Sequence, residues 1–254
     1  MYSGMVLHVV LGALLLLIPV GMLYLLDRKM LGSFLMATVR MVVQLLVLCL
    51  MVWLLVRYDR WWVNLLWAIA MTGYAAFVVV HKMKDVKSAM IVPVGIGLSV
   101  GSLFVGLYLL LFSLPSGSAF HSRWFVPVIM LLLGHSLTTT LRGMKTYLSA
   151  LKSDEEQYEF KRGNGASHLN AVMPFVRRAF IAVMSPTISN LNVTALYTMP
   201  LLLCGFFIAG VKPINAFVVM VILVIGCVAA SVLSLVTAMW LADRNLFDSF
   251  GKLR

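Results

Sequence analysis

A few side chains that could bind a metal ion or carry a proton lie inside long apolar runs of this sequence. His135 is one, because imidazole binds metals of borderline softness and exchanges a proton near neutral pH. Met199 and Cys204 add sulfur donors, but residues five positions apart do not share a helix face. Core packing is therefore the simpler interpretation of the two sulfurs. For His135 the simpler interpretation is a hydrogen bond between helices.

A second group of polar residues could line a water-accessible path. Asn190, Asn192 and Thr194 make the start of one apolar run polar, which is typical either of a substrate path or of a helix end at the inner membrane surface. Arg40 and Gln44 are one helical turn apart and could form a polar contact at a gate. Alternatively, Arg40 reaches the nearby membrane surface while Gln44 bonds a neighbouring helix.

The positions of the acidic residues narrow the possible energy source. All nine fall in connections or at the ends of apolar runs, whereas ion-coupled carriers usually hold an ionisable group at depth. Unless a histidine serves, this chain has none. It also lacks the phosphate-binding pattern G-x-x-x-x-G-K-[ST], so uphill transport would need an ATPase on a separate chain. An intramembrane enzyme is disfavoured, because no nucleophile, base and orienting carboxylate can be assembled there.

The composition identifies the environment of these residues. The chain has 254 residues, of which 62% are hydrophobic and only 11% charged. A soluble domain of that composition would have too little polar surface, so most of its surroundings must be lipid. The formal net charge of +11 comes from Lys and Arg in short connections, which indicates membrane topology and no nucleic-acid partner.

The apolar runs predict an all-α integral membrane protein, with one transmembrane domain covering residues 1–254. Each run is long enough, at about 1.5 Å per residue, to cross a hydrocarbon layer of about 30 Å. The seven predicted transmembrane helices are residues 5–26, 31–56, 61–80, 91–114, 124–148, 188–211 and 214–241.

The distribution of Lys and Arg predicts the orientation. With the N-terminus outside and the C-terminus in the cytoplasm, most of the basic residues fall inside. Only Arg57, Arg60, Arg123 and Lys212 would lie outside. This asymmetry is the usual pattern of multi-pass membrane proteins.

Small residues recur every four positions in two of the runs, which predicts close contacts between helices. The sequence leaves open whether these contacts form within one chain or between two. The residues are Gly97 and Gly101 in the fourth run, and Gly226, Ala230, Ser234 and Ala238 in the seventh.

A long polar stretch, residues 152–187, connects the predicted fifth and sixth helices on the cytoplasmic side. An acidic cluster leads into basic residues, and Gly163 and Gly165 follow as candidate hinges. Pro174 is predicted to start an interfacial helix whose Arg177 and Arg178 meet lipid phosphates or the acidic groups of a partner. The alternative is an inert basic loop that only sets the topology.

Four stretches together resemble the bacterial iron-export ABC permease family, whose plant relatives include aluminium-tolerance half transporters. R-M-V-V-Q-L at residues 40–45 is similar to the family's R-M-x-x-Q-L, and residues 159–167 to its E-x-x-x-x-x-G-A-[ST]. Residues 174–188 resemble P-x-x-R-R-A followed by P-T-[IL], and residues 209–213 resemble A-G-x-x-P. The resemblance covers nearly the whole chain in order and spacing.

Two stretches depart from the family pattern. Residues 199–206 stand where the family tends to carry L-P-G-M-M-T-G-Q, without its paired methionines, threonine and glutamine. Gly134-His135-Ser136-Leu137 stands in place of G-N-[AS]-[ML]. If those family residues contact the substrate, the substrate of this chain differs.

The resemblance implies a permease subunit of an ATP-binding cassette transporter in the bacterial cytoplasmic membrane, working as a homodimer with two ATP-binding subunits. It would export a metal ion such as iron, or another small solute. This chain would then hold no catalytic residue and no cofactor, because ATP and Mg²⁺ bind the partner. A membrane scaffold that binds a cytoplasmic partner through residues 152–187 is the alternative. The residues expected to couple the permease to the ATPase are Glu159, Gly163, Gly165, Ala166, Ser167, Pro174, Arg177 and Arg178.

Overall fold

The computed structural model describes residues 11–83, 90–114, 120–193 and 199–246. Within these ranges the chain forms helices joined by short connections, and no strand occurs, which confirms the all-α prediction. Its internal contacts divide the chain into two compact units, Met1–Arg57 and Tyr58–Arg254.

The first unit contains α2 (Leu17–Leu26) and most of α3 (Arg28–Tyr58). Asp27 separates them, because its backbone is extended at φ −154°. Its carboxylate accepts a hydrogen bond from the backbone N–H of Lys29 at 2.9 Å, which satisfies one of the free donors at the start of α3.

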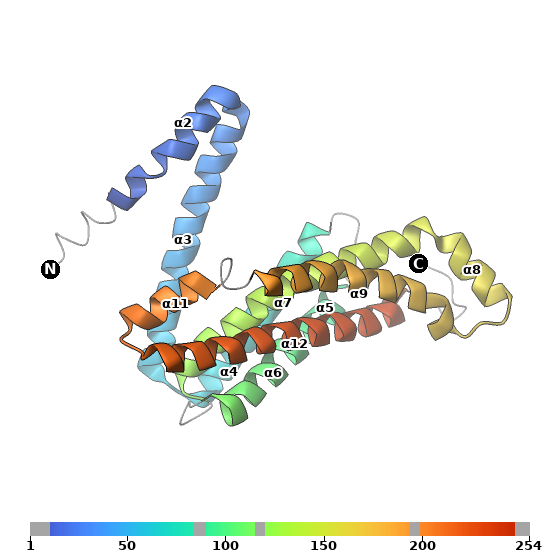
Figure 1. Ribbon diagram of the computed structural model, residues 1–254. Coiled ribbons are helices and arrows are strands. Elements are labelled where there is room, and N and C mark those ends of the chain that lie inside the picture. Colours follow the sequence, from blue (N-terminus) through green and yellow to red (C-terminus); the bar gives the residue numbers. More distant parts are fainter. Residues whose placement is uncertain (1–10, 84–89, 115–119, 194–198, 247–254) are drawn as a thin grey trace. The chain divides into compact units, whose positions relative to one another are not determined.

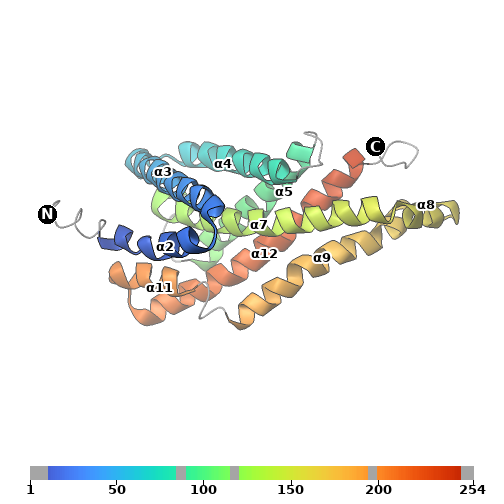
Figure 2. The same cartoon turned by 90° about the horizontal axis from the view of Figure 1, so that it is seen from above.

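The second unit carries the remaining helices (Figure 1). Helices α7 and α12 pack against each other along its centre, with α5 against α12 and α9 against α7 (Figures 1 and 2). In chain order the elements are α4 (Trp61–Lys82), α5 (Ile91–Ser99), η2 (Val100–Phe104), α6 (Val105–Tyr108), η3 (Leu109–Ser113), α7 (Ser122–Ser153), α8 (Glu155–Gly163), α9 (His168–Asn192), α11 (Met199–Ile208) and α12 (Pro213–Leu246).

Small residues bring α12 into backbone contact with the helix before α7. A Cβ atom on Gly97 would lie 2.7 Å from the carbonyl oxygen of Ser234, and one on Gly101 would lie 2.5 Å from that of Ala230. No larger side chain fits at either glycine. The predicted small-residue contacts are therefore confirmed, and they form within one chain.

Two π-helical segments, η2 and η3, interrupt the span Ile91–Ser113. The wider turns of a π-helix shift the facing residues from the α-helical register. In η2 the buried Ser102 hydroxyl donates to the Leu98 carbonyl at 2.6 Å. Gly101, in the same segment, makes the closest approach to α12.

Among the described residues, six helices are long and apolar enough to cross a membrane. The predicted count of seven is thus not confirmed. The predicted first span, residues 5–26, is described only from residue 11, as the shorter apolar helix Leu11–Leu26. The six helices are Arg28–Tyr58, Trp61–Lys82, Ile91–Ser113, Ser122–Ser153, His168–Asn192 and Pro213–Leu246.

The prediction was wrong about the helix that follows the polar stretch. Residues 188–211 do not form one span, because α9 ends at Asn192 and α11 is a separate helix of 10 residues. Pro174 does not start a helix either. The Ser167 hydroxyl accepts a hydrogen bond from the backbone N–H of Asn170 at 3.4 Å and caps α9 seven residues earlier. The polar stretch is therefore divided between the short helix α8 and the first half of α9.

Candidate functional site

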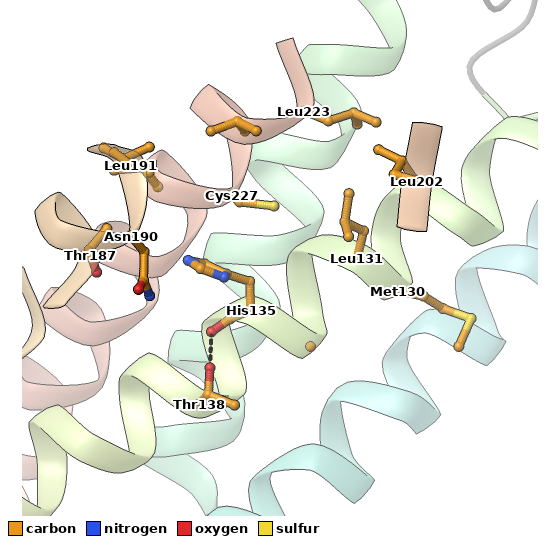
Figure 3. Close-up of a pocket in the computed structure, with 13 residues that line it drawn as sticks. Met130, Leu131, His135, Thr138, Thr187, Asn190, Leu191, Leu202, Leu223 and Cys227 are labelled. Carbon is orange, nitrogen blue, oxygen red and sulfur yellow. Dashed lines mark hydrogen bonds between the residues drawn. The ribbon is translucent and has the colours of Figure 1, made fainter. Parts of the chain in front are cut away.

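A cavity of about 450 Å³ lies within the second unit, lined by residues of α7, α9, α11 and α12 (Figure 3). Most of the lining is apolar, and the polar groups face it from α7, α9 and α12. The apolar lining residues are Met130, Leu131, Leu191, Leu202, Leu223, Val224 and Val228; the others are Gly134, His135, Thr138, Thr187, Asn190 and Cys227.

Among the lining residues, only His135 has a side chain with an ionisable nitrogen. Its ring points toward Asn190 of α9 (Figure 3). Its Nε2 atom is buried and has no hydrogen-bond partner among the described residues. Such an unpaired polar atom is costly in a folded protein and calls for a function. The backbone carbonyl of His135 is paired, since it accepts from the hydroxyls of Thr138 at 2.9 Å and Thr139 at 3.1 Å.

Helix α9 presents Thr187, Asn190 and Leu191 to the cavity, three and four positions apart and hence on one face. The Thr187 hydroxyl donates to the Val183 carbonyl at 2.8 Å. Pro186, one residue earlier, lacks an N–H and cannot bond the carbonyl four residues before it. The cavity wall is therefore formed where the hydrogen-bond ladder of α9 is locally weakened.

Helix α12 contributes Leu223, Val224, Cys227 and Val228, again at helical spacing. The Cys227 thiol is buried and is not in a disulfide. Gly226, beside it, faces away from the cavity: a Cβ atom there would lie 2.5 Å from Leu109 Cδ1. The close fit of Gly226 against η3 is consistent with a rotation of α12 that leaves Cys227 in the cavity lining.

The lining therefore offers an imidazole nitrogen, a thiol sulfur, and the oxygens of Thr and Asn side chains, but no carboxylate. Imidazole and thiolate suit transition metals of borderline or soft character. The described residues contain no group of three or more His, Cys, Asp or Glu side chains that could hold a metal ion. These side chains are suited to binding a solute weakly.

A second polar region lies at the corner between α7 and α9, where α8 connects them. Gly165 has a φ of +82°, a left-handed conformation that favours glycine after a helix. The Ala166 backbone N–H bonds the Lys161 carbonyl at 3.0 Å, and an Arg162 guanidinium N–H donates to the Ala166 carbonyl at 3.0 Å. Arg178 of α9 pairs with Asp154 at the start of α8.

The same corner is joined to α12 by four polar side chains. His168 Nε2 lies 2.6 Å from Asp243 Oδ2, and the Tyr147 hydroxyl donates to Asp243 Oδ1 at 3.1 Å. The Tyr158 hydroxyl lies 2.9 Å from His168 Nδ1. Tyr147 and Tyr158 are almost fully buried. Burial is the main cause that raises the pKa of Tyr158; Arg162 opposes it and Asp243 adds to it.

An open hollow of about 630 Å³ runs along α9 near this corner. The exposed Arg177 and Arg178 give it a basic edge. Its other lining residues are Asn170, Met173, Pro174 and Ile181. Basic and apolar groups side by side are suited to a membrane surface or to a protein partner.

A third polar cluster secures the start of α7, at the opposite end of that helix. The Asp59 carboxylate accepts hydrogen bonds from the backbone N–H of Ser122 at 2.8 Å and from its hydroxyl at 2.7 Å. His121 Nδ1 lies 2.8 Å from the other Asp59 oxygen. These contacts, led by the Ser122 backbone bond, hold the pKa of Asp59 below its ordinary value of 3.8. Asp59 itself has a φ of +37°.

Comparison with known proteins assigns the family. The model of the uncharacterised protein family UPF0014 matches residues 6–247. The chain belongs to the UPF0014 family. It is a multi-pass membrane protein, and the predicted resemblance is confirmed.

Three UPF0014 relatives illustrate the range of the family. The chain is 22% identical over 222 residues to the UPF0014 membrane protein slr1647 of Synechocystis, covering 87% of this chain and 86% of the relative. It is 24% identical over 135 residues to ALUMINUM SENSITIVE 3 of Arabidopsis thaliana (53% and 50%) and 21% identical over 158 residues to the probable iron export permease protein FetB of Escherichia coli (62% and 60%). The matched part spans about half of the Arabidopsis protein. No solved structure matches significantly.

The structure of this chain brings two of the predicted path residues together at the cavity, His135 and Asn190. Asn192 is exposed at the end of α9 and does not line it. Cys204 is exposed on α11 and is also absent from the lining. Arg40 and Gln44 lie one turn apart on α3, in the first unit. Thr194 and the side chain of Met199 lie outside the described residues.

The predicted coupling residues of this UPF0014 chain fall at two places. Glu159, Gly163, Gly165 and Ser167 are exposed at the α8 corner, and Ala166 is half-buried there. Pro174, Arg177 and Arg178 line the hollow on α9. Their coupling role stays a prediction.

Sequence reasoning missed several residues of both regions. Thr187 and Cys227 line the cavity, and each lies one helical turn from a second lining residue, so helical spacing was the available signal. His168 and Asp243 are 75 positions apart, and no local pattern connects them.

Proposed function

We propose that this chain is the permease subunit of an ATP-binding cassette transporter, which moves a metal ion or small solute out of the cytoplasm. The observation that carries the proposal is the cavity with His135, Asn190 and Cys227 in its lining, formed between helices that include three long enough to cross a membrane. Family membership supports it, because one relative is named a probable iron export permease.

Iron or another borderline divalent cation is the substrate we favour. Imidazole nitrogen and thiolate sulfur bind such ions better than they bind Mg²⁺ or Ca²⁺, which prefer oxygen. The absence of a carboxylate from the lining lowers the affinity for the cation. Weak binding favours release, which an exporter requires as much as it requires capture.

The energy would come from a separate ATP-binding subunit that contacts the α8 corner. The chain lacks a phosphate-binding loop of its own. The exposed Glu159 lies on the short helix α8 and the turn at Gly165 follows it; Asp154, at the start of α8, is paired with Arg178 of α9. A short helix fixed in this way transmits a push as a rigid body. ATP and Mg²⁺ would bind the partner, and two permease chains would pair with two ATPase chains.

The predicted orientation is kept in this proposal, with different helix boundaries. If Leu11–Leu26 crosses the membrane together with the six longer helices, the number of crossings is again seven. The N-terminus then lies outside, while α8 and the C-terminus lie in the cytoplasm. In this arrangement α9 is the sixth crossing, and α11 lies near the outer surface. Most of the basic residues remain on the cytoplasmic side.

The test is to purify the chain together with an ATP-binding subunit and to reconstitute the complex in lipid vesicles. We expect Fe²⁺ to stimulate ATP hydrolysis and to be moved in an ATP-dependent way, with Mg²⁺ as the inactive control. A complex that forms but never hydrolyses ATP would support the scaffold alternative. Uphill flux by this chain alone, driven by a pH or sodium gradient, would overturn the proposal.

A further inference from the structure

The four polar side chains at the α8 corner form a connected set across four helices. Tyr147 comes from α7, Tyr158 from α8, His168 from α9, and Asp243 from the end of α12. Both Asp243 oxygens are used: Oδ1 accepts from Tyr147 at 3.1 Å, and Oδ2 lies 2.6 Å from His168. The carboxylate is thus the point on α12 where the polar contacts of the corner converge.

One tautomer of the His168 ring satisfies both of these contacts. With a proton on Nε2, the imidazole donates to Asp243 and its Nδ1 accepts from the Tyr158 hydroxyl at 2.9 Å. The Tyr158 ring also packs edge-on against the imidazole, with ring centroids 5.9 Å apart and an interplanar angle of 83°. His168 is therefore held at both nitrogens, by α8 on one side and by α12 on the other.

Helix α12 connects this joint to the cavity. Cys227 and Asp243 lie on the same helix, separated by about 24 Å at 1.5 Å per residue. After Pro213 the helix contains no proline. Helix α9 also runs from the corner to the cavity, but it contains Pro174 and Pro186, each of which weakens its hydrogen-bond ladder. Helix α7 also links the corner to the cavity, and its one proline, Pro127, lies beyond the cavity. Of the two helices that His168 and Asp243 join, α9 and α12, the helix α12 is the stiffer.

We propose that the His168–Asp243 contact is the joint through which movement of the α8 corner reaches α12, and through α12 the Cys227 wall of the cavity. His168 and Asp243 are positioning residues in this proposal, which rests on the proposed function. When a partner displaces α8 and the start of α9, His168 carries Asp243 with it. The displacement then arrives at the cavity along one unbroken helix, whereas α9 bends at its prolines.

The Arg178–Asp154 pair does not transmit movement of the corner to α12. It joins α9 to the start of α8 and leaves α12 untouched. Loss of this pair would loosen the corner, while loss of His168–Asp243 would remove the link from α9 to α12 and leave the Tyr147–Asp243 bond in place.

Two amide variants of His168 separate the contacts of its two nitrogens. In His168→Gln the amide nitrogen takes the place of Nε2 and keeps a donor for Asp243. In His168→Asn it takes the place of Nδ1, near Tyr158, and loses the reach to α12. The two variants differ by one methylene group. We therefore expect similar yields, thermal unfolding temperatures and co-purification with the ATPase for both.

The measurement is substrate moved per ATP hydrolysed in reconstituted complexes. We expect His168→Asn to lower this ratio about tenfold, within the usual range of coupling energies, while ATP hydrolysis continues and His168→Gln stays close to the wild type. Equal ratios in the two variants would overturn the joint. So would a parallel fall of hydrolysis and transport, because that is the result of structural damage alone.

Asp243→Asn tests the same joint from the other side and keeps a side-chain oxygen for Tyr147. Tyr147→Phe is its control, since it removes the other hydrogen bond to the same carboxylate. We expect uncoupling in Asp243→Asn and a normal ratio in Tyr147→Phe; the reverse order would refute the joint. Failure of the wild-type complex to move any substrate would instead refute the proposed function.

Discussion

The middle and the end of the α7–α12 pair differ in how completely their polar groups are paired. In the middle of the pair, four buried polar atoms have no hydrogen-bond partner in the part of the chain that the structure describes: His135 Nε2, whose residue lines the cavity, and the hydroxyls of Ser136, Thr140 and Ser234, which are not part of the lining. At the α8 corner, Tyr147, Tyr158, His168 and Asp243 satisfy one another at 2.6 to 3.1 Å.

This difference separates a binding region from a force-bearing one. A buried polar atom left unpaired costs about 1–3 kcal/mol, and a solute in the cavity that offers a partner to His135 recovers part of that cost. Paired groups offer no such gain, and they hold the helices in one arrangement. The middle of the bundle is therefore suited to receive a ligand, and its end is suited to move as a unit.

The largest effect is expected from a change that disturbs both regions together. Gly101→Val should destabilise the protein by about 3 kcal/mol, because even a Cβ atom there would lie 1.9 Å from Ser234 Oγ and 2.5 Å from the Ala230 carbonyl. Thermal unfolding in detergent measures the change. Gly73→Ala is the control, since nothing lies within 4 Å of its added Cβ, and equal destabilisation by both would contradict the packing described.

Next in size is a change that affects the cavity alone. His135→Leu should raise the substrate concentration for half-maximal ATPase stimulation about tenfold, since one bond to a charged ligand contributes about 1.5 kcal/mol or more. Cys227→Ser should act in the same direction, whereas Cys204→Ser, on an exposed residue of α11, should have no effect. If the two cysteine variants behave alike, the cavity is not the substrate site.

A smaller effect should distinguish the corner from the cavity. Gly165→Ala should cost about 1 kcal/mol, because a φ of +82° is unfavourable for a residue with a Cβ atom. It should lower transport per ATP and leave the half-maximal substrate concentration unchanged. Gly163→Ala, within α8, should leave both values unchanged. A shift in substrate affinity by Gly165→Ala would show that the two regions are not separate.

The smallest effect concerns Asp59, at the far end of α7 from the corner. Because its folded-state pKa is depressed below 3.8, its contribution to stability is present above that pH and is lost as the pH falls through the lower, folded-state pKa. Thermal unfolding between pH 5 and about pH 3 should therefore be less steep in pH for Asp59→Asn than for the wild type. An identical pH dependence would mean that the Ser122 contacts do not stabilise the charged form.

Local patterns in the sequence predicted the helical membrane class, the small-residue contacts, and two residues of the cavity. Gly97, Gly101 and the α12 residues opposite them are recognisable because close packing in lipid requires small side chains at regular spacing. His135 and Asn190 are recognisable because polar groups are rare in apolar helices.

The errors arose where the outcome depends on contacts between distant residues. Arg177 and Arg178 made this segment look separate from the span that follows, yet both lie within α9, which continues to Asn192. Pro174 looked like a helix start, but the Ser167 cap comes first. The pairing of His168 with Asp243 depends on the tertiary fold, which hydropathy and local motifs do not report.

The glycine seam between α5, η2 and α12 also restricts how α12 can travel. Large side chains on facing helices interdigitate and resist sliding. Gly97 and Gly101, in contrast, have no side chain and bring their backbone close to Ala230, Ser234 and Ala238. At this seam no side chain of α5 or η2 blocks translation of α12, whereas Leu109 at Gly226 and Leu235 at Gly143 interlock elsewhere along the helix. Tilting away would open a gap at the backbone itself. At the glycine seam, a force on α12 would therefore favour sliding parallel to the seam over separation from it.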